Sequence, residues 1–160
     1  MSDDLDRVFF PAHRLEAMPE RPHRHQFNER ALRHTRDLGA LAGFSDMGLA
    51  IVRVRPGDET TEFHFHGQDE EFLYILSGRG EADIGEHHLE VRPGDAMLFS
   101  KNSPPHAMRN PEDAQQDLVY LMGGTRSPVD VCTYPRAGLR MYRIDGAKEF
   151  VPIEQVKPVS

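Results

Sequence analysis

Two histidines, His64 and His66, are the residues whose type and spacing point most directly to chemistry. Side chains two positions apart on a β-strand lie on the same face, so this pair would project into one space. Glu71 follows a short turn and would open the next strand, where an antiparallel neighbour can bring its carboxylate to the imidazoles. His106 lies further along the chain, beyond the turn residues Pro93-Gly94-Asp95.

These four side chains would form a mixed nitrogen and oxygen ligand set. Such a set suits a divalent ion of Fe, Mn, Ni, Co, Cu or Zn, and the ligand types alone do not choose among these metals. Four protein ligands on a six-coordinate ion leave positions open for water, substrate or dioxygen, as a catalytic site requires. We predict one divalent metal per chain, bound by His64, His66, Glu71 and His106, and no organic cofactor.

The elements that must position these residues are short β-strands. From about residue 47 onward, β-rich segments alternate with turn signals such as Pro56-Gly57-Asp58 and Ser77-Gly78. Many short strands at this spacing indicate an all-β sandwich or barrel rather than βαβ units. The expected strands are 49–55, 62–66, 72–77, 81–84, 88–91, 96–100, 118–122, 141–144 and 150–153.

The first 45 residues have a different pattern. Residues 27–41 (FNERALRHTRDLGAL) are expected to form one short helix, and residues 7–10 a strand or an arm packed on the barrel. The chain has 160 residues, one domain's length, and no repeat or linker divides it. We expect an N-terminal arm over 1–45 and a barrel over 46–160, with at most one or two short helices.

The ligand pattern resembles that of the cupin superfamily. The first cupin motif is a glycine followed by His-x-His, a glutamate and a second glycine. Its counterparts here are Gly57, His64, His66, Glu71 and Gly78, with one extra residue before His64. The resemblance covers residues 47–123 and implies a double-stranded β-helix, or jelly-roll, barrel with the metal inside its mouth.

The second cupin motif is matched by Gly94, His106 and Asn110, with departures. Ser100-Lys-Asn-Ser103 lies where the family has an internal proline and glycine, and it is one residue longer. The short segment between the motifs resembles compact microbial members, and the tail resembles small bacterial cupins without a settled reaction. The family also implies a homodimer, for which exposed strand edges or Phe9-Phe10 could supply the interface.

Two further residues are candidates for proton transfer. Glu62 shares the strand face of His64, and a carboxylate in an apolar cavity beside a metal can have a tuned pKa. The alternative is a glutamate that lines the mouth or the surface. Tyr120 either forms barrel wall or presents its hydroxyl to a ligand. For Arg53 and Arg55, solvated or ion-paired positions are expected in preference to binding of an anionic substrate.

The other histidines serve as internal comparisons. His23 and His25 are also spaced as His-x-His, but no strand with a glutamate follows, so a solvated segment or packing arm is expected. His87 and His88 are adjacent in a short hairpin and would face opposite sides, so they cannot chelate one ion together.

Charge and composition limit the partners. The chain has 19 Lys+Arg against 26 Asp+Glu, a net charge of −7, which argues against nucleic acid or an anionic membrane as a partner. Cys132 is the single cysteine, which excludes an internal disulfide, and a small buried apolar role is expected for it. No apolar run is long enough for a membrane helix, and the acidic start is unlike a secretory signal, so a cytoplasmic location is expected.

Three functions remain open. The favoured one is a metal-dependent enzyme acting on a small organic molecule, such as a sugar or carboxylate, by isomerase or epimerase, lyase or oxygenase chemistry. The second is a non-catalytic, metal-dependent binder or sensor of a small ligand, and the third is a metal-free barrel that serves as a dimer scaffold. The complete ligand set argues against the third. By resemblance, Glu71 argues against the thiol dioxygenases, which use three histidines alone.

Overall fold

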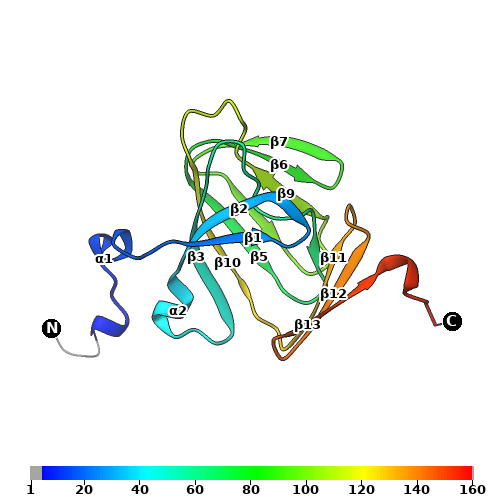
Figure 1. Cartoon of the computed structure of the whole chain (residues 1–160). Coiled ribbons are helices and arrows are strands. Elements are labelled where there is room, and N and C mark those ends of the chain that lie inside the picture. Colours follow the sequence, from blue (N-terminus) through cyan, green and yellow to red (C-terminus); the bar gives the residue numbers. More distant parts are fainter. Residues whose placement is uncertain (1–4, 160) are drawn as a thin grey trace.

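The protein folds as a barrel with two β-walls, described by a computed structural model for residues 5–159 (Figure 1). The first wall is a six-stranded antiparallel sheet, which begins with the N-terminal hairpin and ends on an open edge strand. In spatial order its strands are β1 (Arg21–His25), β2 (Asn28–Asp37), β3 (Met47–Val54), β10 (Leu118–Thr125), β5 (Glu71–Ser77) and β8 (Ala96–Phe99).

Two smaller sheets form the second wall. The first contains β7 (His87–Val91), β6 (Gly80–Ile84) and β9 (His106–Arg109). The other contains β13 (Ala147–Pro152), β12 (Leu139–Ile144), β11 (Val129–Tyr134) and β4 (Phe65–His66). An isolated antiparallel bridge between His64 and His106 links the two sheets just before β4. The two small sheets of the second wall are therefore joined at two of the residues predicted to bind metal, His64 and His106.

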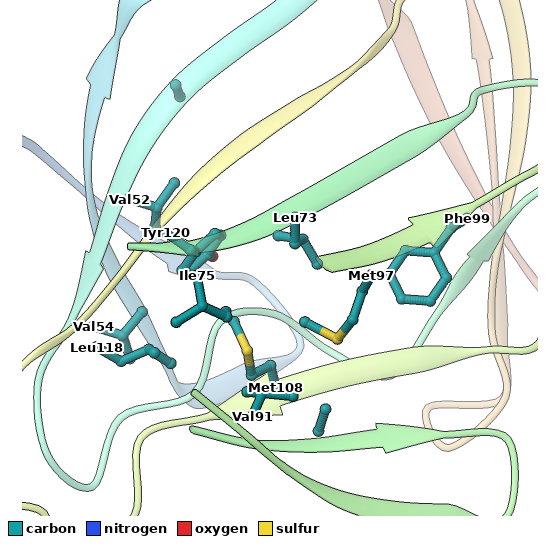
Figure 2. Close-up of a cluster of buried hydrophobic side chains, with 12 residues drawn as sticks. Val52, Val54, Leu73, Ile75, Val91, Met97, Phe99, Met108, Leu118 and Tyr120 are labelled. Carbon is teal, nitrogen blue, oxygen red and sulfur yellow. The ribbon is translucent and has the colours of Figure 1, made fainter. Parts of the chain in front are cut away.

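The core lies between the two walls, and strand alternation explains which residues fill it (Figure 2). On β3, Ala50, Val52 and Val54 are buried while the residues between them are partly exposed. Other strands of the same sheet contribute Leu73, Ile75, Met97, Phe99, Leu118 and Tyr120, and β9 in the opposite wall contributes Met108. Apolar burial on this scale is the main stabilising contribution to a domain of this size.

Short helices flank the barrel, as expected. They are η1 (Leu5–Arg7), α1 (Ala12–Glu16), α2 (Leu38–Ala42) and η2 (Ile153–Gln155). α2 begins where the Asp37 carboxylate accepts a hydrogen bond from the Ala40 amide at 2.8 Å, and it ends at Gly43 in the left-handed conformation. No helix in the described part of the chain is long and apolar enough to cross a membrane.

The expected helix over 27–41 is wrong. Asn28–Asp37 is the strand β2, and only the last residues of that segment continue into α2. β2 pairs with β1 on one side and with β3 on the other, so the sheet satisfies its backbone groups. Helix propensity is a weak preference that such tertiary pairing overrides. The same pairing explains β1, which the sequence pattern did not predict.

Every strand predicted after residue 47 is present, with shifted ends. The expected strand over 62–66 is reduced to β4 and the bridge at His64. β9 and β11 are additional strands that the sequence pattern did not predict.

A partly buried ion-pair cluster attaches the N-terminal arm to the sheet. The Arg53 guanidinium donates to both carboxylate oxygens of Glu20 and, at 2.8 Å, to Asp117. Arg36 lies 3.3 Å from the same Glu20 carboxylate. Arg53 is therefore ion-paired, as expected, and it is not available to a substrate.

Candidate metal centre

The predicted metal ligands come from neighbouring elements at one end of the barrel. His64 and His106 are opposite each other in the bridge between the two small sheets, with reciprocal backbone hydrogen bonds of 3.1 and 2.8 Å. Their rings are 4.7 Å apart between centroids. Glu71 is the first residue of β5 in the opposite wall, so the barrel closes the carboxylate onto the two imidazoles.

Glu71, His64 and His106 form a compact group of candidate ligands. The Glu71 Oε2 atom lies 3.2 Å from His106 Nε2 and 3.8 Å from His64 Nε2. All three ligand atoms lie within 4.8 Å of one another. This spacing fits donors that surround a single ion.

His66 adjoins this group through His64. The two rings are 5.0 Å apart between centroids and nearly perpendicular. The ligand atoms of His66, His64 and Cys132 also lie within 4.8 Å of one another, whereas His66 is not in the tighter group with Glu71 and His106. The structure thus brings all four predicted ligands to one locality, with His66 and Cys132 on its β4–β11 side.

Each of the three imidazoles is oriented through its Nδ1 atom. His64 Nδ1 donates to the backbone carbonyl of Glu62 at 2.9 Å, and His66 Nδ1 donates to Asp130 Oδ2 at 2.7 Å. His106 Nδ1 lies 3.4 Å from the carbonyl of Pro104. Carbonyl and carboxylate oxygens only accept, so in the neutral rings of His64 and His66 Nδ1 carries the hydrogen and the Nε2 lone pair remains for a ligand. His106 Nε2 instead donates to Glu71 Oε2 at 3.2 Å, and a metal bound there would replace this hydrogen. This arrangement fits a bound divalent metal.

The protonation states of His64 and Glu71 also favour metal binding. Burial lowers the pKa of His64 to about 3, so its imidazole is neutral at neutral pH. Burial alone would raise the pKa of the Glu71 carboxyl. The hydrogen bond with His106 and the neighbouring imidazoles outweigh burial and lower that pKa to about 2. A neutral imidazole and an ionised carboxylate are the forms that bind metals.

A second layer of charged residues fixes His66. Asp130 is fully buried, and its Oδ1 atom accepts hydrogen bonds from the backbone amides of Gln68 and Asp69 at 2.9 and 3.1 Å. Asp69 is in turn held by Arg143 at 2.6 Å. Burial opposes both shifts, but the contact between His66 and Asp130 raises the pKa of His66 and holds the pKa of Asp130 well below its ordinary value.

Aromatic packing restrains the other two imidazoles. Phe99 stacks on His106 with ring centroids 3.5 Å apart and an interplanar angle of 3°. Tyr134 stacks less closely on His64, at 6.0 Å. Rings held on one face by packing and at Nδ1 by a hydrogen bond have little freedom to rotate away from a shared ligand.

The two candidate proton-transfer residues differ in their placement. Tyr120 is buried on β10 and lines a small cavity together with Glu71, His64 and His106. Burial raises the pKa of its hydroxyl to about 12, so at neutral pH it can donate a proton or hydrogen bond but cannot act as a base. Glu62 is also buried, and its backbone carbonyl orients His64. Its role in proton transfer stays a prediction.

A larger cavity of about 580 Å³ opens beside the group. His66 and Glu71 are among its lining residues, together with the hairpin β1–β2 and the end of β10. A volume of this size accommodates a small organic molecule. Two of the four candidate ligands are therefore in contact with a space that a substrate could enter.

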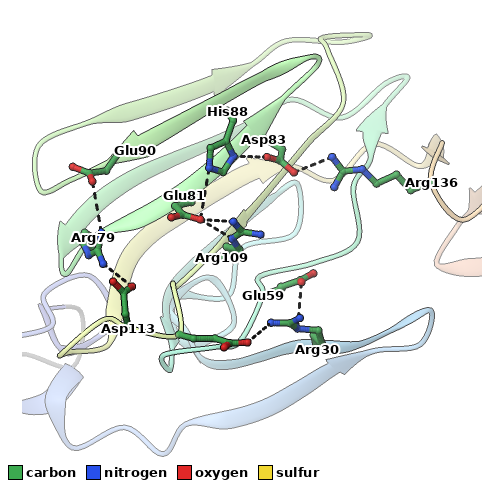
Figure 3. Close-up of polar contacts among 11 residues, drawn as sticks. Arg30, Glu59, Arg79, Glu81, Asp83, His88, Glu90, Arg109, Asp113 and Arg136 are labelled. Carbon is green, nitrogen blue, oxygen red and sulfur yellow. Dashed lines mark hydrogen bonds and ion pairs between the residues drawn. The ribbon is translucent and has the colours of Figure 1, made fainter.

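The comparison histidines lie outside the candidate metal groups found among the described residues. His23 and His25 are on β1. His88 belongs to an exposed network of ion pairs on β6, β7 and β9, where its Nδ1 atom is 2.8 Å from Asp83 (Figure 3).

Comparison with known proteins places this barrel in a family. The cupin domain model matches residues 50–122, which contain all four predicted ligands. A solved structure from Acidithiobacillus ferrooxidans, a proposed sugar phosphate isomerase, is 30% identical, covers 99% of both chains and superposes with a TM-score of 0.94. This chain belongs to the cupin superfamily.

Other relatives of this cupin are more distant or are matched over part of their length. A sugar phosphate isomerase structure from Silicibacter pomeroyi is 22% identical, covers 89% of this chain and 90% of its own, and has a TM-score of 0.75, which supports the fold alone. Protein SchB of Streptomyces halstedii is 37% identical over 94 residues, or 59% of this cupin and 64% of SchB. The match therefore spans less than two thirds of that curated relative.

Sequence reasoning missed the residues that support and surround the ligands. Asp130 and Arg143 are far from His66 and Asp69 in the sequence, and no local pattern predicts the contacts between them. Cys132 is fully buried, as expected, but it also lies beside His64 and His66, because β11 pairs with β4. Arg33 approaches from β2, the segment predicted as a helix.

Proposed function

We propose that this cupin is a metal-dependent enzyme that isomerises a small hydroxycarbonyl compound of the sugar type. The ligand group carries the proposal: three imidazoles, each with Nδ1 directed at an oxygen acceptor, lie around the ionised Glu71 beside a cavity. A metal-free scaffold has no need of such an arrangement. Support for isomerisation comes from the Acidithiobacillus ferrooxidans structure, a proposed sugar phosphate isomerase that covers 99% of this chain.

Different residues would bind the metal and transfer protons. A divalent ion bound by His64, His66, Glu71 and His106 would polarise a substrate carbonyl or hydroxyl as a Lewis acid. The Nδ1 contacts keep the imidazoles oriented for this task. Tyr120, protonated at neutral pH, would donate to a substrate oxygen in the small cavity that it shares with Glu71. Glu62 is the residue proposed to accept a proton.

The test combines metal content with proton exchange. Untagged protein, purified without chelator and reconstituted with Mn, Fe, Co, Ni, Cu or Zn, is expected to retain about one equivalent of metal. His64→Ala should fold but lose the metal, whereas the matched control His88→Ala should retain it. Incubation with aldoses, ketoses and their phosphates in D₂O should incorporate deuterium beside the carbonyl, as detected by proton NMR.

Two variants separate the metal from the proton donor. Tyr120→Phe should keep the metal and lose about 100-fold or more in kcat, the usual contribution of a general acid. Glu62→Gln should show a comparable loss if its carboxylate accepts the proton. Metal retention without deuterium exchange in any substrate would overturn isomerisation and favour the non-catalytic binder. Failure to retain any metal after reconstitution would overturn the metal-dependent enzyme altogether.

A further inference from the structure

The larger cavity beside the ligand group has an unusual concentration of cations for an acidic protein. Four arginines line it, Arg21, Arg33, Arg126 and Arg143, in a chain with a net charge of −7. All four lie outside residues 50–122, the segment that matches the cupin domain. The cationic lining therefore comes from segments that the cupin domain model does not match.

Arg33 is the innermost of these arginines. Alternation along β2 places Ala31, Arg33 and Thr35 on the same face of the strand, and the last two line the large cavity. Arg33 also lines the small cavity together with Tyr120 and Glu71. It is therefore the arginine that contacts both the open space and the surroundings of the metal ligands.

The guanidinium of Arg33 is incompletely satisfied. It contacts two neutral groups, the carbonyl of Thr60, to which Nη1 donates over a long 3.4 Å, and the hydroxyl of Tyr120. Its Nε atom is buried without a partner, and no carboxylate in residues 5–159 forms an ion pair with it. A buried N–H group without an acceptor is costly, so this side chain is suited to receive an acceptor from a ligand.

Arg126 extends across the backbone of β3 at Gly48. A side chain at Gly48 would place its Cβ atom 3.4 Å from Arg126 Nε and 3.5 Å from Nη2. Within the described chain Arg126 has no carboxylate partner, and the same holds for Arg21 on β1. Arg143 differs, because Asp69 holds it at 2.6 Å. Three of the four arginines therefore have donors to spare.

We propose that Arg33, Arg126 and Arg21 bind an oxyanion group of the substrate, a phosphate or a carboxylate, while the reacting end approaches the metal ligands. Guanidinium groups match such oxyanions because their planar donors form paired, charge-assisted hydrogen bonds. This inference rests on the proposed function and adds to it a substrate class, anionic small molecules, and the residues that select them.

The charge balance of the cavity supports an anionic ligand. Its carboxylates are Asp37, Asp69, Glu70 and Glu71, equal in number to the arginines. Asp69 is paired with Arg143, and Asp37 caps α2. Glu71 belongs to the metal ligand group, where a divalent ion would add two positive charges. With the metal bound, the cavity would carry a net positive charge that an oxyanion neutralises.

The test measures binding of inorganic phosphate and of succinate by isothermal titration calorimetry. Both probes are titrated into chelator-treated protein and into metal-loaded protein, with NaCl at equal ionic strength as the reference. Arg33→Gln and Arg126→Gln are compared with Arg92→Gln, whose parent side chain is 72% exposed and outside the cavity. All three variants change the net charge equally.

We expect a saturable anion site that survives removal of the metal. Arg33→Gln and Arg126→Gln should each weaken the Kd by about tenfold or more, whereas Arg92→Gln should bind as the parent does. Arg33→Lys should restore part of the affinity, because it keeps the charge but loses the paired donors. Binding of phosphate but not succinate would indicate a phosphorylated substrate. Binding of succinate but not phosphate would indicate a carboxylic acid.

Several outcomes would overturn the inference. The first is that neither probe binds above the NaCl reference. The second is that the parent and both glutamine variants bind equally well. The third is that the probes bind to metal-loaded protein but not to chelator-treated protein. The anion site and the proposed isomerase can also fail separately. His64→Ala should lose metal and turnover but keep phosphate binding, so an intact anion site in a protein without isomerase activity would leave this inference standing.

Discussion

At the scale of single residues, Asp130 has the most demanding position in the molecule. It is fully buried, yet it is ionised, because His66 and the backbone amides of Gln68 and Asp69 donate to it. An ionised carboxylate is stable in such a place only when donors replace water. Its contact with His66 makes it a positioning residue for the candidate metal ligand.

Replacing Asp130 tests this positioning role. Asp130→Asn keeps an oxygen that can accept from the two backbone amides but lacks the charge that orients His66. We expect metal affinity to fall by about 10- to 100-fold, the usual effect of losing such a partner. Competition with a chromogenic chelator measures the change. Asp113→Asn, at an exposed ion pair with Arg79 (Figure 3), is the control and should leave the affinity as in the parent.

At the scale of elements, a cluster of charged residues adds to the strand pairing that joins the N-terminal hairpin to the barrel. Glu20 precedes β1 and pairs with Arg53 on β3 and Arg36 on β2. The hydrogen bond from Arg53 lowers the pKa of the Glu20 carboxyl from its ordinary 4.5, although burial opposes the shift. The ionised carboxylate of Glu20 is therefore more stable in the folded protein than in the unfolded chain.

Acid should weaken this attachment in a defined direction. The folded-state pKa is depressed, so the contribution of Glu20 is complete above pH 4.5 and is lost as the pH falls through the lower folded value. Glu20→Gln should reduce the free energy of unfolding at pH 7 by about 1 to 2 kcal/mol. The difference from the parent should shrink on acidification, as measured by urea unfolding. A constant difference between pH 7 and pH 3 would contradict this account.

The elements also show where sequence reasoning succeeds and where it stops. Alternation of apolar and polar residues predicted β3 and the other central strands, because burial on one face leaves that pattern in the sequence. His64, His66 and Glu71 lie close together in the sequence, so their proximity is also predictable. β2 has helix-forming residues, and its pairing with β1 and β3 makes it a strand. The contact between His66 and Asp130 crosses 64 positions of the chain, and local patterns carry no information on it.

At the scale of the whole molecule, the exposed face of β5 and β8 supports the prediction of a homodimer. Leu98 on the edge strand β8 is 76% exposed, and Tyr74 and Leu76 on β5 are also exposed. An edge strand with apolar side chains is a ready surface for a second copy. We expect light scattering after size exclusion to give twice the monomer mass of 18.2 kDa, and Leu98→Glu to give the monomer. A monomeric parent at tens of micromolar would contradict this prediction.

The hairpin β1–β2 closes one side of the cavity, whereas all four candidate metal ligands lie between residues 64 and 106. The candidate metal ligands and the hairpin wall of the cavity are thus in separate stretches of the chain. A mutation in the hairpin can change which molecule fits without disturbing the ligands of the metal. Related proteins that keep the barrel but differ in the N-terminal hairpin can therefore acquire new substrates through few mutations, because the four candidate metal ligands stay unchanged.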